Sequence, residues 1–203
     1  MALINQASKE LQVKIVYYGP AMGGKTTNLV QVHEHVQVAG DRGKLISLAT
    51  NSDRTLFFDF LPIESMTIKG FKTKFQLYTV PGQVIYNTTR QLVLRGVDGI
   101  VFVADSQYSK MPENVESFQN MMDNLATLKL NLGDIPYVLQ YNKRDMPEVA
   151  PVEYMEFLLN NREVQVPSFS ATAHKCDGVF ESLNMITRLL LHKFINQTMP
   201  PTA

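Results

Sequence analysis

The sequence has little cysteine and no excess of charge of either sign. Cys176 is the only cysteine, so the chain has neither an intramolecular disulfide nor a site built from several thiolates, which suits a reducing cytosol. Nineteen basic residues balance nineteen acidic ones. The chain therefore lacks the positive field on which non-specific nucleic-acid binding depends, and we expect no nucleic-acid partner.

The sequence also lacks the segments that would place it in or on a membrane. No stretch approaches the roughly 20 apolar residues of a membrane-spanning helix, and the N-terminus MALINQASKE has no secretion signal. Ala2 stands where myristoylation requires glycine, and the C-terminus MPPTA offers no cysteine for prenylation. We expect a cytoplasmic protein without direct membrane insertion.

Alternation of apolar and amphipathic segments predicts an α/β fold. With 203 residues, 45% of them hydrophobic, and no repeat or linker, the chain is expected to form a single domain over residues 1–203. Strands are predicted at 13–18, 44–49, 71–80, 99–105, 137–142 and 166–171. Helical stripes of expected core residues fall at Val115, Phe118, Met122 and Leu125, and at Phe180, Leu183, Ile186, Leu190 and Phe194. This pattern predicts a mostly parallel central sheet with helices on both faces and a ligand site at the carboxyl ends of the strands.

A phosphate-binding loop follows the first apolar strand. Gly19, four residues, and then Gly24-Lys25-Thr26 match G-x-x-x-x-G-K-[ST] between a predicted strand and a predicted helix. Backbone N–H groups and the helix N-terminus would surround the phosphates, Lys25 would reach the β and γ phosphates, and Thr26 would offer its hydroxyl to Mg²⁺.

The segment Asn142-Lys143-Arg144-Asp145 decides the base. It follows a predicted strand and has the N-K-x-D pattern of GTP-binding proteins. The Asp145 carboxylate can accept hydrogen bonds from guanine N1–H and the exocyclic amine, whereas adenine would leave it unpaired. Ser170-Ala171, after the next strand, is typical of a short loop over the base oxygen. An ATP-using kinase is disfavoured by this pattern and by the absence of an arginine-rich lid.

A second loop, Thr79-Val80-Pro81-Gly82-Gln83, is typical of a segment that senses the γ phosphate. Ras-like proteins usually carry aspartate where this chain has Thr79. The segments GPAMGGKTTN, SDRTLFFDFLP, TVPGQ and NKRD together resemble the MglA family of bacterial Ras-like GTPases of cell polarity and gliding motility, and the similarity runs from about Leu3 to the last helix. The resemblance implies a Ras-like P-loop NTPase fold and a GTP-binding switch with slow hydrolysis.

The residues expected at the site follow from these motifs and from the resemblance. Gln83 is expected to orient the attacking water, and Arg54 is the candidate arginine finger supplied in cis. Thr26, Thr55 and, through water, Asp53 are hypothesised to complete the Mg²⁺ shell. The expected contacts to GTP or GDP are Gly19, Met22, Gly23, Gly24, Lys25, Thr26, Thr27, Thr55, Gly82, Asn142, Lys143, Asp145, Ser170 and Ala171.

Partners are implied by the resemblance alone. The implied partners are a GTPase-activating dimer of the roadblock type (MglB) and response-regulator and cytoskeletal effectors. The resemblance also implies that such partners recruit the protein to a cell pole. The run Leu56 to Pro62 is interpreted either as an edge strand of the core or, in part, as a partner patch.

Other residues leave alternatives open. Met22 is bulky for a phosphate loop and could slow hydrolysis. Together with Thr79 it keeps open the alternative of a GTP-gated adaptor with negligible hydrolysis. His174 and Cys176 have no partner ligands nearby in the sequence, so no metal site is expected there.

Overall fold

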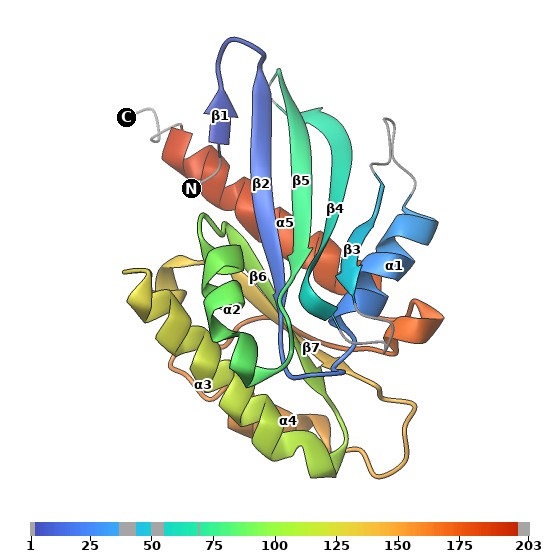
Figure 1. Ribbon diagram of the computed structural model, residues 1–203. Helices are drawn as coiled ribbons and strands as arrows, with labels where there is room; N and C mark the ends of the chain where they lie inside the picture. The colour runs from blue at the N-terminus through green and yellow to red at the C-terminus, as the bar shows by residue number, and fades with distance from the viewer. Residues whose placement is uncertain (1–2, 37–43, 50–54, 69, 199–203) are drawn as a thin grey trace.

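The structure is a computed structural model that describes residues 3–36, 44–49, 55–68 and 70–198. At its centre lies one sheet with the strand order β3-β4-β5-β2-β6-β7-β8, and β1 pairs with β2 (Figure 1). The strands are β1 (Leu3–Asn5), β2 (Glu10–Tyr18), β3 (Ile46–Ala49), β4 (Thr55–Ile68), β5 (Phe71–Thr79), β6 (Gly99–Asp105), β7 (Tyr137–Asn142) and β8 (Ser168–Ser170). The α-helices are α1 (Lys25–His35), α2 (Asn87–Leu94), α3 (Met111–Thr127), α4 (Val152–Leu159) and α5 (Val179–Thr198).

Parallel pairing brings the carboxyl ends of five strands to one edge. β5, β2, β6, β7 and β8 pair in parallel, whereas β3 and β4 are antiparallel to their neighbours. Tyr17 lies opposite Thr79, and Asp105 lies opposite Asn142. Loops that leave these ends are therefore neighbours, although the sequence separates them widely.

Helices cover both faces of the sheet. Helices α1 and α5 lie on one face, and α2, α3 and α4 lie on the other (Figure 1). Every residue of β6 is buried, as a strand covered on both faces requires, whereas β5 alternates between buried and half-buried positions. The predicted strands and the mostly parallel sheet are confirmed, with boundaries that shift by a few residues.

β4 corrects the interpretation of the aromatic run as an edge strand. This strand lies between β3 and β5, and the alternate residues Asp59, Leu61 and Ile63 are buried. The ring of Phe60 packs on Tyr78 of β5, with ring centroids 4.7 Å apart. The run is therefore interior to the sheet because it pairs on both sides.

Of the four core residues predicted on α3, two are buried and two are not. Phe118 and Leu125 are buried, but Val115 is 42% exposed and Met122 is only half-buried. The core face of α3 instead carries Met111, Asn114, Phe118, Met121 and Leu125. Amide and methionine side chains share this face, and apolar periodicity alone misplaces its centre.

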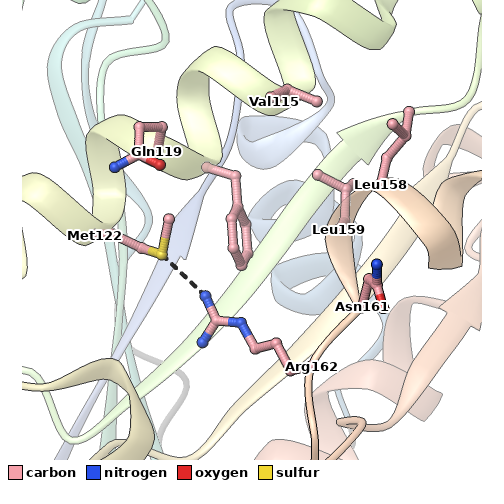
Figure 2. Close-up of a pocket in the computed structure, with 8 residues that line it drawn as sticks. Val115, Gln119, Met122, Leu158, Leu159, Asn161 and Arg162 are labelled. Atoms are coloured by element: carbon pink, nitrogen blue, oxygen red, sulfur yellow. Dashed lines mark hydrogen bonds between the residues drawn. The ribbon is translucent and has the colours of Figure 1, made fainter.

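Val115 and Met122 border a groove between α3 and α4 with a volume of about 200 Å³ (Figure 2). Arg162 lies over the ring of Phe118, 5.3 Å from its centroid, and donates to the sulfur of Met122 at 2.9 Å (Figure 2). None of the predicted nucleotide contacts lines this groove. In the described part of the chain, no helix is long and apolar enough to cross a membrane.

Candidate nucleotide-binding site

The phosphate loop joins β2 to α1 at the carboxyl edge of the sheet. Gly19 has φ 144°, and a Cβ atom there would lie 2.1 Å from the carbonyl oxygen of Val103 in β6. Only glycine tolerates both the backbone conformation and the contact. Gly23 and Gly24 complete the turn, α1 begins at Lys25 with no side-chain cap on its N-terminus, and Thr27 lies in its first turn. An uncapped helix N-terminus attracts anions.

Lys25 is a buried cation of this loop. Its ammonium group donates to the carbonyl oxygens of Gly19 at 3.0 Å and Pro20 at 2.6 Å. Burial, and then the charge of Arg90, lower the pKa of Lys25 to about 7. Phosphate oxygens would supply the negative charge that two carbonyl dipoles only partly replace, so this environment fits a phosphate group.

A carboxylate that the sequence analysis missed lies beside the phosphate loop. Asp59 of β4 is fully buried, and its Oδ2 accepts from the hydroxyl of Thr26 at 2.5 Å and from that of Thr79 at 2.8 Å. The Asp59 N–H donates back to the Thr79 hydroxyl at 2.8 Å. Thr79 therefore takes the place of the usual aspartate and holds a carboxylate that comes from the neighbouring strand.

The sequence did carry a signal for Asp59. It is the only carboxylate in the run Leu56 to Pro62, and it shares strand parity with the buried Leu61 and Ile63. An ionisable residue at a core position of a strand usually has a functional or paired environment. What the sequence does not show is that β4 pairs with β5, which brings Asp59 next to Thr79.

Asp53 and Arg54 lie outside the described residues, so the structure gives no position for the Asp53 ligand or the Arg54 finger. Thr55 is the first residue of β4 and pairs with Ala49 of β3. These three assignments remain predictions.

The TVPGQ turn lies directly against the phosphate loop. A Cβ atom on Gly82 would be 2.2 Å from the Cα atom of Ala21, so the two loops are in backbone contact. Gln83 follows this contact and is half-buried. Met22 has φ 58° and is 72% exposed, so its side chain points to solvent and does not crowd the loop interior.

The NKRD segment connects the phosphate loop to the loop after β8. The Asn142 amide donates to the carbonyl oxygen of Gly23 at 2.8 Å and accepts from the Ala173 N–H at 2.8 Å. Lys143 forms a 2.7 Å ion pair with the buried Asp105 at the end of β6. These contacts fix three loops relative to one another.

Asp145 lies at the same edge, with a histidine and a lysine side chain nearby. His174 Nε2 is 3.4 Å and Lys175 Nζ is 3.9 Å from its Oδ2. The sequence analysis did not anticipate this contact, because the loop that carries His174 lies twenty-nine positions after Asp145 in the chain. The carbonyl of Ala171 accepts from the Arg144 N–H at 3.0 Å, which holds the Ser170-Ala171 loop beside the NKRD segment.

The residues at this edge fit Mg²⁺ as well as phosphate. A hydroxyl and a carboxylate meet at Thr26 and Asp59, and oxygen atoms are the ligands that Mg²⁺ prefers. Among the described residues, no group of three or more His, Cys, Asp and Glu side chains could hold a metal by itself. Mg²⁺ usually binds through one or two protein oxygens plus phosphates and water, which this donor set matches.

Comparison with known proteins identifies the class that this fold and site define. The sequence model of the Ras family matches residues 45–192. The Ras-related protein Rab-13 of Canis lupus familiaris is 27% identical over 140 residues, which are 68% of this chain and 66% of Rab-13. Rab-13 of Bos taurus is 27% identical over 155 residues, 73% of each chain.

A second relative is far more similar. The mutual gliding-motility protein MglA of Myxococcus xanthus (strain DK1622) is 52% identical over 191 residues, which are 94% of this chain and 96% of that protein. The chain therefore belongs to the Ras family of small GTPases and, within it, to the family of MglA. The fold is that of a Ras-like P-loop NTPase, and proteins of this class bind guanine nucleotide with Mg²⁺ and hydrolyse GTP.

Proposed function

We propose that this chain is a GTP-dependent switch whose GTP-bound surface recruits effectors and whose slow hydrolysis of GTP to GDP and phosphate releases them. The observation that carries this proposal is the convergence at one sheet edge of the phosphate loop, the Thr79–Asp59 pair, the TVPGQ turn and the NKRD segment. A switch needs the γ-phosphate sensor in contact with the phosphate loop, and Gly82 lies against Ala21.

Asp59 is the carboxylate that we assign to the Mg²⁺ site in place of the one missing at position 79. It already accepts from the Thr26 hydroxyl, the expected metal ligand of the phosphate loop. Bound Mg²⁺ would neutralise charge on the phosphates during transfer. Thr55 and a water-bridged Asp53 remain the other candidates for this shell.

Hydrolysis is assigned to Gln83 and Arg54. Gln83 directly follows the glycine that touches the phosphate loop, and we assign to its amide the orientation of a water beside the γ phosphate. Arg54 would add positive charge near the transferring group, and a partner would stimulate hydrolysis by bringing it there. The structure describes neither the Arg54 side chain nor a partner, so both roles are proposals.

Exposed apolar side chains beside the turn favour a protein partner. Ile85 is 79% exposed and Leu92 on α2 is 52% exposed, and both follow the TVPGQ turn within ten residues of Gln83. A patch of this kind next to a γ-phosphate sensor suits an effector or activator. By similarity to the gliding-motility protein MglA, we assign it to an MglB-type roadblock dimer and to effectors of polarity or motility.

Phosphate release tests this function. Purified protein is loaded with GTP and Mg²⁺, and a single turnover is followed with and without a roadblock-domain dimer, for the native chain, Gln83→Ala and Arg54→Ala. We expect slow basal release, strong stimulation by the dimer, and loss of stimulation by about a thousandfold in Arg54→Ala. Tight GTP binding with no release under any condition would instead establish a GTP-gated adaptor with negligible hydrolysis.

A further inference from the structure

Arg90 is a fully buried arginine whose role none of the nucleotide motifs explains. It projects from α2, has no exposed surface, and takes part in no ion pair among the described residues. A buried guanidinium is costly unless its donors are satisfied. Its hydrogen bonds therefore show what the protein uses it for.

Two of these bonds go to consecutive carbonyl groups of the TVPGQ turn. Arg90 Nε donates to the carbonyl oxygen of Pro81 at 2.9 Å, and Nη2 donates to that of Gly82 at 2.5 Å. The planar fork of arginine can serve both acceptors at once. The third donor, Nη1, bonds to Asn120 Oδ1 on α3 at 2.5 Å.

The α3 side of this arrangement is itself fixed. Asn120 Oδ1 also accepts from the hydroxyl of Tyr18 at 2.7 Å, and Tyr18 is the last residue of β2. The Arg90 guanidinium lies over the Tyr18 ring, 5.4 Å from its centroid. Arg90 therefore ties the turn to the sheet and to α3, which the core packing holds in place.

Binding of the Pro81 and Gly82 carbonyl groups by Arg90 also sets the direction of the N–H groups in the same two peptides. A peptide group is planar and trans, so an N–H points away from the carbonyl of the same peptide. Holding the Pro81 and Gly82 carbonyls toward Arg90 directs the N–H groups of Gly82 and Gln83 to the other side of the turn. Gly82 touches Ala21 of the phosphate loop, so these N–H groups belong to the turn that borders the expected γ phosphate.

We infer that Arg90 is a positioning residue that orients the Gly82 and Gln83 peptide groups for recognition of the γ phosphate. This inference rests on the proposed GTP switch, because it concerns the same TVPGQ turn. GTP affinity should depend on Arg90 more strongly than GDP affinity does, since only GTP carries the γ phosphate. Loss of a merely structural arginine would weaken both nucleotides by the same factor.

The test compares GDP with the non-hydrolysable analogue guanosine 5′-(β,γ-imido)triphosphate. Dissociation constants are measured for both nucleotides, in the presence of Mg²⁺, on the native chain, Arg90→Met, Arg90→Lys and the control Arg95→Met, which removes an exposed arginine just after α2. In Arg90→Met we expect the analogue to bind at least tenfold more weakly and GDP to change less than threefold. Arg95→Met should change neither constant.

Arg90→Lys keeps the charge but cannot span two carbonyls and Asn120 together. It should show the same selective loss at a smaller factor, and it decides the question if Arg90→Met does not fold. Equal losses for both nucleotides, or an unchanged ratio in both variants, would overturn the inference. Failure of the native chain to bind either guanine nucleotide would instead overturn the proposed function.

Discussion

At the scale of single residues, the site depends on a carboxylate contributed by a different strand from the one on which Ras-like proteins usually carry it. Thr79 and Asp59 satisfy each other through two hydrogen bonds, so the threonine positions the acid without being one. Asp59 also reaches Thr26, which places its charge beside the phosphate loop. The proposed metal site therefore draws on both β4 and β5.

Asp59→Asn tests this assignment. Asparagine preserves the size but removes the charge, and a charge-assisted contact is roughly twice as strong as a neutral one. We expect the Mg²⁺ concentration that half-maximally slows GDP release to rise at least tenfold. Release of a fluorescent GDP derivative, measured across a Mg²⁺ titration, gives this value.

Asp123→Asn is the matched control, because Asp123 is an exposed carboxylate on α3 away from the phosphate loop. It should leave the Mg²⁺ dependence unchanged. An unchanged or lower Mg²⁺ requirement in Asp59→Asn would refute the role of Asp59 in the metal site.

At the scale of elements, a buried network of polar side chains joins α1, which follows the phosphate loop, to β7, which ends at the NKRD segment. Gln140 of β7 donates to Asn28 of α1 and to Ser182 of α5, each at 2.9 Å, and accepts from Asn28 at 2.8 Å. All three residues are fully buried. The network therefore fixes the relative positions of α1, β7 and α5.

Gln140→Leu should destabilise the protein. Leucine has a similar volume but leaves the side-chain oxygen of Asn28 without its hydrogen-bond donor inside the core, so we expect the free energy of unfolding to fall by about 1–3 kcal/mol. Urea unfolding measures the change. Gln119→Leu, on the exposed face of α3, should change it by less than about 0.5 kcal/mol. Similar effects of the two substitutions would show that the network contributes nothing to stability.

The elements also show what the sequence could and could not predict. The predicted strands and the family resemblance were correct because continuous apolar runs and fixed motif spacings are local signals. The position of β4 in the sheet was not predicted, because this fourteen-residue strand of mixed polarity has no clear hydrophobic period. Its antiparallel pairing with β5 is also not visible in the local sequence. His174 and Asp59 were missed for the same reason, since each reaches the site through contacts distant in sequence. Arg90 is close in sequence to the carbonyl groups that it binds, and it was missed because an arginine on a helix carries no local signal of burial.

At the scale of the whole molecule, the nucleotide edge and the exposed patch of Ile85 and Leu92 are adjacent parts of one chain segment. The segment from Thr79 to Leu94 contacts the phosphate loop at Gly82 and solvent at Ile85. A change at the γ phosphate would therefore reach the proposed partner surface without passing through the core.

Ile85→Asp tests that connection. A charge on this patch should reduce stimulation by a roadblock-domain dimer at least tenfold, because an apolar anchor would meet a carboxylate, while basal phosphate release should change less than twofold. Val164→Asp is the control, since Val164 is also 79% exposed but lies in the segment after α4. Equal stimulation of both variants would show that the partner does not use the Ile85 patch.

Base preference tests whether this sheet edge binds guanine nucleotide through Asp145. The measurement compares the dissociation constants of GTP and xanthosine 5′-triphosphate for the native chain and for Asp145→Asn. Asparagine can accept from the base N1–H and donate to the 2-oxo group of xanthine, but it cannot accept from both guanine donors. We expect the native chain to prefer GTP, and we expect Asp145→Asn to lose roughly a hundredfold in GTP affinity and to prefer xanthosine triphosphate. Unchanged GTP affinity in Asp145→Asn would contradict the placement of the base at this edge.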